Sequence, residues 1–587
     1  MYLDDEQKFY ASCPGYSLFV PKKLSNVGFP YIITLHYNNL MGQKCLHLNN
    51  FSGFFSLIKH YLPRLELLIA NGNQAQLLGG LKGIEKESLR ISKNGFIAQT
   101  PHPDVLGSAL THPHITTDYS EALMEFITPP FAKIDQSLEF LKHIHQFVYD
   151  NLQDEILLAT SMPCGINGDK SIPIAQYGNS NVGTMKHVYR RGLGYRYGRT
   201  MQAIAGIHFN YSVPEGLWPV LQHLENSRLP LEQFIADAYF GMIRNFQRLG
   251  WIILYLFGGS PAICCSFFKS QPELMKNFDY FDQHTLYHPY ATSLRMSDIG
   301  YKSATQAGLK IDYNSLPGYV DSLSNAIETS LPEYEEIGVK IDGEYRQLNS
   351  NILQIENEYY STIRPKQIAK SCEKPTLALH RRGVRYIEVR SLDLDLFNPI
   401  GIDENRACFL EALLLTCLMH DSPASSALES EKNNANQLLV AYQGRQPGLQ
   451  LQRGENTVVL TDWANEILDA MQAVCEILDA ENPRKPYTES LAIQRGLVQN
   501  AELTPSARIL AGMRHNALPF APYALNISAR YEQDFRKQRL AQQRTQFFED
   551  CARESHFKQK EIEAYDQLSF DEFLQCYFNQ NCENLNC

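Results

Sequence analysis

Four segments of the chain show a period of two, so that one face of each can be largely apolar and the other can carry polar groups. Apolar side chains at every second position predict a strand with one face in a core and the other face carrying polar groups. The four segments are Leu81–Arg90, Met201–Tyr211, Asn351–Glu358 and Tyr386–Asp393. We therefore expect four strands whose polar faces can meet in one sheet.

Other segments follow a helical period. Between residues 131 and 152 apolar side chains recur at three- and four-residue steps, which predicts an amphipathic helix. Residues 51–68 and the chain after residue 463 show helical patterns too. Residues 421–436 are small and polar and predict a surface loop. The stretch 115–127 fits either a strand or a helix, and Asp118 could cap that helix.

The order of these patterns predicts one large domain. Strand-like and helix-like segments alternate from about residue 55 to residue 400, so we expect an α+β sheet surrounded by helices, with a helical C-terminal part. We assign residues 55–565 to this domain and residues 566–587 to a C-terminal tail. Residues 1–54 show no sustained period, and we interpret them as an N-terminal extension, either poorly ordered or not native.

The composition and net charge of the chain limit the kinds of partner that it can bind. The chain has 587 residues and a formal net charge of -11, which argues against generic binding to nucleic acid. No apolar run reaches the roughly 18 residues needed to span a bilayer, so no membrane partner is expected. The 13 cysteines are scattered without a CxxC pair, as in reduced cytoplasmic proteins. We expect a cytoplasmic monomer.

The predicted strands group several carboxylates. Glu85 and Glu87 share one strand face, where two like charges roughly 7 Å apart repel unless they are solvated or bridged by a cation. Gln202, His208 and Asn210 share a second face. A solvated edge strand and an ordinary core histidine are the alternatives to a Mg²⁺ site, since Mg²⁺ prefers carboxylate and phosphate oxygens.

Two further strands add charges of both signs. Glu388 and Arg390 share a face, either as an ion pair within the sheet or as part of a site. The segment 351–358 carries Gln354, Glu356 and Glu358 on one face and runs into Arg364 and Lys366, and the ambiguous stretch adds Asp118, Glu121 and Glu125. Two or three Mg²⁺ ions on a nucleotide's phosphates would neutralise such a surface. The pattern therefore favours phosphoryl transfer, in which positioning and charge neutralisation dominate.

Common phosphate and metal motifs are absent from the sequence. It has no GxxxxGKS or GxxxxGKT and no HExxH. The glycines of residues 192–198 have the wrong spacing for a dinucleotide fold, and residues 258–262 lack the last glycine of a nucleophile elbow. Any active site must therefore be assembled from separate segments.

The segments in question resemble a known family. They include GIEKESLR, GSALTHPHITTDYSEALMEFITP, SMPC, AQYGNSNVG, YRRGLGYRYG, MQAIAGIHFNYSVP, YLFGGSPAIC, YATSLRMSDIGY, QLNSNILQIENEYYSTIRPK and YIEVRSLDLDLFNPIGI. In sequence and order they resemble glutamate–cysteine ligase of the bacterial type, over roughly residues 55–560.

The resemblance implies a fold and a reaction. The fold would be that of glutamine synthetase, an antiparallel sheet forming a funnel with helices around it. ATP would phosphorylate the γ-carboxylate of glutamate, and the cysteine amine would displace phosphate to give γ-glutamylcysteine. This is the first step of glutathione synthesis. Mg²⁺ or Mn²⁺, in two or three ions, would be required, and glutathione would act as a feedback inhibitor.

The resemblance also assigns residues. The implied metal ligands are Glu85, Glu87, Asp118, Glu125, His208 and Glu388. The implied cysteine pocket consists of Tyr189, Gln202, Tyr301 and Tyr360, with Tyr119 nearby at a position where the family pattern implies phenylalanine. Arg295 would grip an amino acid carboxylate. Arg364, Lys366 and Arg390 would bind phosphates and, with Arg295, carry the catalytic positive charge.

Three other functions remain as alternatives. A related ligase could use another amine in place of cysteine, with the sheet and metal site unchanged. A metal-dependent hydrolase would turn over without an amino acid acceptor. A non-catalytic binding protein would keep the fold but lose metal carboxylates, whereas all six implied ligands are present here.

Overall fold

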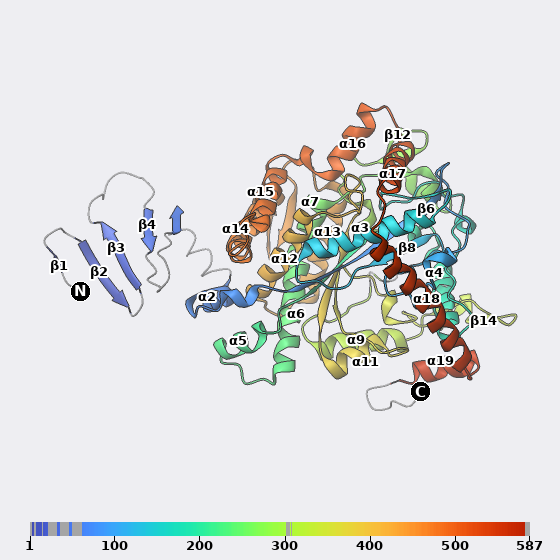
Figure 1. Cartoon of the computed structure of the whole chain (residues 1–587), viewed down its shortest axis with the longest axis horizontal. Coiled ribbons are helices and arrows are strands. Elements are labelled where there is room, and N and C mark those ends of the chain that lie inside the picture. The colour runs from blue at the N-terminus through green and yellow to red at the C-terminus, as the bar shows by residue number, and fades with distance from the viewer. Residues whose placement is uncertain are drawn as a thin grey trace.

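The computed structural model describes residues 62–300, residue 306 and residues 308–580, together with five short strands before residue 50 (Figure 1). These strands are β1 (Leu3–Asp4), β2 (Lys8–Cys13), β3 (Tyr16–Pro21), β4 (Ile32–Leu35) and β5 (Leu46–Asn49). Within these residues no helix is long and apolar enough to cross a membrane.

A seven-stranded antiparallel sheet forms the centre of the described chain. The strand order is β16-β17-β10-β6-β8-β7, and β9 pairs with the end of β6. The strands are β6 (Leu81–Ser92), β7 (Ile115–Thr117), β8 (Leu123–Ile127), β9 (Glu155–Leu157), β10 (Ile207–Ser212), β16 (Ile363–Lys366) and β17 (Tyr386–Leu392). The predicted α+β class with an antiparallel sheet is confirmed.

Two of the four predicted strands are confirmed over nearly their full length, as β6 and β17. The predicted strand 201–211 begins only at Ile207, because Met201–Ala203 form a 3-10 turn. The prediction of a strand over 351–358 is wrong: this segment is irregular and ends in a 3-10 turn at Glu356–Glu358. The ambiguous stretch 115–127 is a β-hairpin, β7 and β8, so Asp118 lies in a turn and caps no helix.

The two faces of the sheet differ in chemistry. Ile84, Phe209 and Val389 are completely buried and point to one face. Four helices pack against that face or against one another: α3 (Ile134–Asn151), α6 (Leu231–Leu249), α7 (Trp251–Phe257) and α12 (Glu404–Met419). Helix α12 is buried along almost its whole length and contacts α3, α6 and β10. Glu85 and Glu87 have the other parity along β6 and therefore point to the opposite face. Lys82 and Lys86 share the parity of Ile84 and are buried against the core helices, where they contact Glu411 of α12 and His145 of α3.

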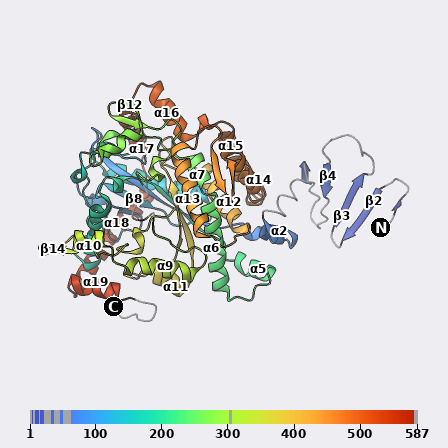
Figure 2. The same cartoon turned by 180° about the vertical axis from the view of Figure 1, so that it is seen from behind.

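The remaining helices surround this core (Figures 1 and 2). They are α2 (Pro63–Ala70), α4 (Asn181–Tyr197), α5 (Leu217–Leu224), α9 (Leu316–Glu328), α10 (Pro332–Ile337), α11 (Pro375–Arg382), α13 (Ala427–Gln443), α14 (Leu460–Leu478), α15 (Pro486–Gln499), α16 (Pro505–His515), α17 (Phe520–Lys537), α18 (Gln542–Tyr565) and α19 (Phe570–Phe578). Both views place α16 and α17 above the sheet, α14 to one side of it, and α9 and α11 below it.

Three small antiparallel sheets complete the described elements. They consist of β11 (Ala262–Cys264), β12 (Asp279–Asp282) and β13 (Thr285–Tyr287), of β14 (Lys340–Ile341) and β15 (Glu344–Tyr345), and of β18 (Gln450–Arg453) and β19 (Asn456–Val459).

The helix predicted over residues 131–152 is confirmed as α3, and the helical pattern after residue 463 is confirmed as α14 and the helices that follow. The surface loop predicted for 421–436 is wrong in its second half, where α13 begins. Ser426 caps this helix by accepting a hydrogen bond from the backbone N–H of Glu429. The predicted helix 51–68 is described only from residue 62 on, and α2 begins at Pro63.

The C-terminal helices are joined to the rest of the fold by specific bonds. The Oγ of Ser555 on α18 accepts a hydrogen bond from the backbone N–H of Ser108 at 2.9 Å. Helix α19 contacts α4, and the Asn181 side chain at the start of α4 donates to Asp566 at 2.6 Å. The last residues, 581–587, lie outside the described residues.

Candidate active site

The strand register brings the predicted charged residues into one surface. Glu85 on β6 lies directly opposite His208 on β10, and Glu87 lies opposite Glu125 on β8. Glu388 on β17 lies opposite Arg364 on β16. All six residues belong to the face that the core helices do not cover. We call this face of β16, β17, β10, β6 and β8 the acidic face.

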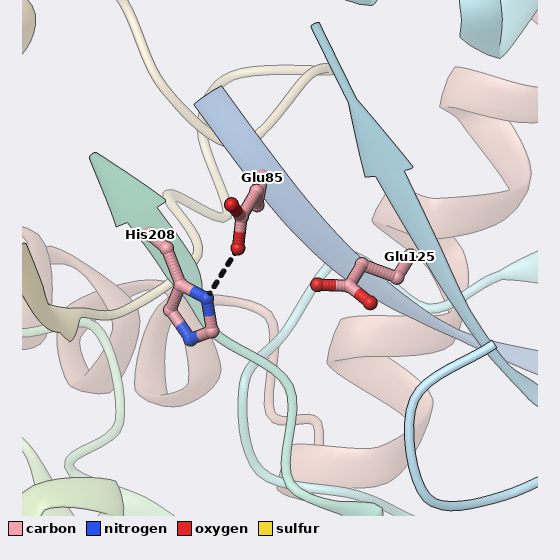
Figure 3. Close-up of side chains that lie close together, drawn as sticks. All are labelled: Glu85, Glu125 and His208. Atoms are coloured by element: carbon pink, nitrogen blue, oxygen red, sulfur yellow. Dashed lines mark hydrogen bonds and ion pairs between the residues drawn. The ribbon is translucent and has the colours of Figure 1, made fainter. Parts of the chain in front are cut away.

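Glu85, Glu125 and His208 lie close enough to bind a common ion. Each offers one ligand atom, and these atoms lie within 4.8 Å of one another. Figure 3 shows the three side chains converging from adjacent strands. His208 Nδ1 lies 3.0 Å from Glu85 Oε2, and the Asn210 amide donates to Glu85 Oε1 at 2.8 Å. Glu87 and Glu388 each come within 3.8 Å of the His208 ring.

Electrostatics divides these carboxylates into two groups. Burial raises the pKa of Glu125 well above its ordinary value, and the charges of Glu85, Asp118 and Glu87 raise it further. Burial likewise raises the pKa of Glu87, and the Asp118 carboxylate adds to the effect. These acids crowd one another without enough positive charge nearby. A divalent cation with oxygen ligands would relieve this repulsion, so the donor set fits Mg²⁺, or Mn²⁺ where the imidazole takes part.

Glu388, in contrast, is paired with cations. Burial alone would raise its pKa, but Lys366, Arg390 and His208 outweigh that effect, and the pKa lies well below its ordinary value. Lys366 Nζ lies 3.2 Å from the carboxylate, and Arg390 Nη1 lies 3.1 Å from it. Arg364 donates to the main-chain carbonyls of Asn357 and Tyr359. The positive charges predicted for phosphate binding therefore border the acidic face at β16 and β17.

A cavity adjoins this face. Its lining combines acidic-face residues with residues from the segments before β10 and around residue 300: Glu87, Asp118, Met201, Gln202, Ile204, His208, Arg295, Gly300, Tyr360 and Arg390. The Gln202 amide donates to the Tyr360 hydroxyl at 2.9 Å. The cavity thus joins carboxylates, two arginines and a phenol, a combination suited to a zwitterionic amino acid.

Arg295 is held from several sides at the cavity wall. Its guanidinium donates to the carbonyl of Arg390 at 3.0 Å and lies 3.7 Å from Asp393. Asp393 is buried and accepts hydrogen bonds from the backbone of Gly259 at 2.8 Å and from Ser293 at 2.9 Å. Gly206 leaves the space for the guanidinium, since a Cβ there would overlap it.

The turn between β7 and β8 carries Asp118. The Tyr177 hydroxyl donates to the carbonyls of Thr117 at 2.8 Å and Asp118 at 2.9 Å, and Arg190 of α4 donates to the same Asp118 carbonyl. Glu121 accepts backbone N–H groups from two other segments and so fixes the turn. The positions of Tyr177, Arg190, Gly206 and Asp393 depend on long-range contacts, and no local sequence pattern indicates them.

Most predicted site residues come together. The six predicted metal ligands share the acidic face or the cavity beside it, and Gln202, Arg295 and Tyr360 line that cavity. Tyr119 and Tyr189 do not line it: Tyr119 is buried with its hydroxyl against Gly194, and Tyr189 is half-buried and packs against the core. Tyr301 lies outside the described residues.

The carboxylates of the segment 351–358 do not join the acidic face. Glu356 accepts a hydrogen bond from the Thr376 hydroxyl at 2.6 Å. Glu358 forms a fully buried ion pair with Arg196 at 2.9 Å. This segment is not a strand of the central sheet. Its two carboxylates therefore form hydrogen bonds and an ion pair within the fold and do not face the site.

Known proteins share this chain's sequence over most of its length. The family model described as glutamate-cysteine ligase matches residues 65–440. The glutamate–cysteine ligase of Alcanivorax borkumensis is 47% identical over 528 residues, which cover 89% of this chain and 100% of the relative. That of Pseudomonas aeruginosa is 48% identical over 514 residues, 88% of this chain and 97% of the relative.

Solved structures share the fold. A crystal structure of glutamate–cysteine ligase from Francisella tularensis in complex with AMP matches with a TM-score of 0.80 and 39% identity, covering 85% of this chain and 98% of that chain. A bifunctional glutathione synthetase from Pasteurella multocida matches with a TM-score of 0.63 and 26% identity, covering 80% of this chain and 55% of that one.

Proposed function

Because this chain belongs to the glutamate–cysteine ligase family, it is an enzyme that forms γ-glutamylcysteine from glutamate and cysteine at the expense of ATP, and we propose that its acidic face is the site of that reaction. The convergence of Glu85, Glu125 and His208 beside a cavity lined by Gln202 and Arg295 carries the proposal. Formation of γ-glutamylcysteine is the first step of glutathione synthesis.

The carboxylates and the histidine of the acidic face are the candidate metal ligands. We assign two or three Mg²⁺ or Mn²⁺ ions to Glu85, Glu87, Asp118, Glu125, His208 and Glu388. When bound, such ions neutralise the nucleotide phosphates and the charge that develops during phosphoryl transfer. Lys366 and Arg390 would add positive charge from the neighbouring strands, with Arg364 beside them.

The cavity accounts for substrate orientation. Arg295 presents a guanidinium that can grip an amino acid carboxylate with two parallel hydrogen bonds. Gln202 and Tyr360 offer polar groups to the acceptor, and Tyr119, Tyr189 and Tyr301 are further candidates for the cysteine side of the site. AMP in the Francisella tularensis structure supports a nucleotide site in this fold.

The chemistry needs no nucleophile from the protein. A γ-carboxylate oxygen of glutamate attacks the γ-phosphorus of ATP, and the bond from that phosphorus to ADP breaks. The cysteine nitrogen then attacks the acyl carbon of γ-glutamyl phosphate, and the carbon–oxygen bond to phosphate breaks. The amine proton leaves to the departing phosphate or to a carboxylate of the site. The protein's part is to align three substrates and to balance their charge.

Other expectations stay predictions. They are feedback inhibition by glutathione, a monomeric state and a cytoplasmic location. Between residues 62 and 580 the cysteines with described side chains are free thiols.

The first test is ADP release by the purified protein with ATP and Mg²⁺ under reducing conditions. Glutamate alone, cysteine alone, both together, and glutamate with α-aminobutyrate are compared. We expect release to need glutamate together with an amine, and a γ-glutamyl dipeptide of the expected mass to form. Preference for an amine other than cysteine would reassign the acceptor, and release without any amino acid would indicate a hydrolase.

The metal assignment is tested by Glu85→Gln. This change removes one anionic ligand and keeps the side chain's shape, so we expect turnover to fall by about 100-fold or more while the protein stays folded. The matched control is Glu333→Gln on the exposed surface of α10, which should leave turnover unchanged. Normal turnover in Glu85→Gln would contradict the assignment.

A further inference from the structure

Asn210 lies on the acidic face, two residues beyond His208 on β10. Its side-chain amide donates to Glu85 Oε1 at 2.8 Å, while His208 Nδ1 lies 3.0 Å from Glu85 Oε2. A carboxylate oxygen can only accept, so the NH₂ group of Asn210 must face Glu85. The two polar residues of β10 thus hold the two oxygens of one carboxylate, which fixes its rotation.

The oxygen of the Asn210 amide makes no such contact. Asn210 Oδ1 is buried and has no hydrogen-bond partner within the described residues. An unpaired buried carbonyl loses its hydrogen bonds to water without replacement, so a folded protein rarely keeps one without a reason. Carboxamide oxygens are among the ligands that hard divalent cations accept.

The cross-strand neighbours of Asn210 are a carboxylate and a glycine. In the sheet register Asn210 lies opposite Glu388 on one side and Gly83 on the other. Gly83 has no side chain, and a Cβ there would lie 3.6 Å from Asn210 Cβ. The amide is therefore flanked by two carboxylates of the acidic face, Glu85 and Glu388, and by no bulky side chain of β6.

Strand formation alone does not account for asparagine at this position. Asparagine is depleted in strands, and the residues on either side, Phe209 and Tyr211, are fully buried aromatic side chains typical of a strand. A residue with poor strand propensity in the middle of β10 indicates a task beyond packing.

We propose that Asn210 is a positioning residue of the active site: it orients Glu85 through its NH₂ group and offers its oxygen to the cation, or to water on that cation. The proposal rests on the metal site assigned above. It predicts that Asn210 contributes to metal affinity as a neighbour of a ligand does, typically by 10–100-fold.

The test measures Mn²⁺ binding directly, from the electron paramagnetic resonance signal of free Mn²⁺, together with turnover. Asn210→Ala should weaken Mn²⁺ binding by about 10-fold or more, and excess metal should restore much of the lost rate. Threonine is a better strand former, and its hydroxyl can donate or accept a hydrogen bond. The Mn²⁺ affinity of Asn210→Thr should therefore lie between those of the wild type and Asn210→Ala. The control is Ser212→Ala on the same strand face, whose hydroxyl bonds to the carbonyl of Arg385.

The outcomes separate the two proposals. Weak binding in Asn210→Ala, with an unchanged melting temperature and rescue by metal, supports the role of Asn210. Wild-type affinity in Asn210→Ala or Asn210→Thr, with Mn²⁺ bound normally by the wild type, overturns that role and leaves the metal site intact. Failure of the wild-type protein to bind Mn²⁺ at all would overturn both. Should Asn210→Ala fail to fold, Asn210→Thr decides by the same criteria.

Discussion

Tyr119 carries a phenolic hydroxyl at a buried position. The residue is buried, and its hydroxyl has no hydrogen-bond partner within the described residues. Burial raises the pKa of this phenol, and the hydroxyl lies against Gly194, where a Cβ would come within 2.6 Å of it. The hydroxyl therefore occupies space without a polar partner.

Tyr119→Phe removes that hydroxyl. Because an unpartnered buried hydroxyl costs about 1 kcal/mol or more, we expect the variant to be more stable by about 1 kcal/mol and to keep its activity. Denaturant unfolding and steady-state kinetics measure the two effects. Tyr195→Phe on the exposed side of α4 is the control and should change neither. A destabilised Tyr119→Phe would show that the hydroxyl has a partner in solution.

Gly206 lies where Glu87 and Arg295 approach the backbone. Its N–H donates to the Glu87 carboxylate at 2.6 Å, and a Cβ would overlap the Arg295 guanidinium. Gly206→Ala should displace Arg295 and lower kcat/KM by about 100-fold, because a misplacement of about 1 Å is enough for such a loss. The comparison is Gly496→Ala on α15, where a Cβ meets nothing. Equal kinetics for the two variants would argue against a role for Arg295.

At the scale of elements, the β7–β8 hairpin carries two predicted metal ligands, one on a strand and one in the turn. Glu125 sits on β8 and is fixed by sheet pairing with Glu87. Asp118 sits in the turn and depends on Tyr177 and Arg190, which hold its main-chain carbonyl. The Asp118 N–H also donates to the carbonyl of Leu123 at 2.9 Å, so the turn is held both within the hairpin and by residues outside the sheet.

Tyr177→Phe tests that support. The variant loses hydrogen bonds to the carbonyls of Thr117 and Asp118, and we expect a loss of about 1–2 kcal/mol in the free energy of unfolding. Turnover should fall about 10-fold with a higher KM for Mg²⁺, since Asp118 is no longer fixed. Tyr280→Phe, on exposed β12, controls for loss of a hydroxyl. Loss of stability with an unchanged KM for Mg²⁺ would separate Tyr177 from the site.

At the scale of helices and strands, some elements could be predicted from the sequence and others could not. Alternation predicts β6 and β17 because their two faces meet different environments, acids on one side and buried Ile84 and Val389 on the other. It fails at 351–358, where the alternating acids bond to Arg196 and Thr376 instead of entering the sheet. Helix α13 was missed because most of its residues are polar and few are buried.

The site itself depended on two kinds of information. Alternation brought Glu85 and Glu87 together, and it placed His208 and Glu388 on polar faces. Which strands are neighbours, and hence which acids meet, follows from sheet order, which local patterns do not contain. The family resemblance implied the set of metal ligands but no strand order. Supports such as Asp393 and Tyr177 arise from contacts between distant segments, so only the folded chain reveals them.

The whole molecule is closed on one side by α18, which packs on α3 and on the segment before β7. Beneath this packing lies buried His112, whose Nδ1 accepts hydrogen bonds from the backbone N–H groups of His114 at 3.1 Å and Ile115 at 2.8 Å. Burial, followed by the nearby charges of His114 and His102, lowers the pKa of His112 to about 3. The folded state therefore holds this ring neutral.

This arrangement predicts a loss of stability in mild acid. Unfolded histidine has a pKa of about 6.5, so between about pH 6.5 and pH 3 the unfolded chain binds the extra proton and folding becomes less favourable as pH falls. The contribution of His112 is complete above pH 6.5 and reduced by about 2 kcal/mol at pH 5. Denaturant unfolding at pH 7.5 and pH 5 should show a smaller acid loss in His112→Gln than in wild type. The exposed His515→Gln should behave as wild type does.

The two-sided character of β6 has a consequence for how its gene can vary. Glu85 and Glu87 alternate with Ile84, Lys86 and Ser88, and each set faces a different environment. Deleting or inserting one codon within this strand would exchange the two sets, placing carboxylates among the core helices and Ile84 or Lys86 over the substrates. We expect β6 to tolerate volume-conserving single substitutions such as Ile84→Val but no change of length. A library of single-codon deletions, scored for growth that depends on the enzyme, would then show an uninterrupted gap across these residues.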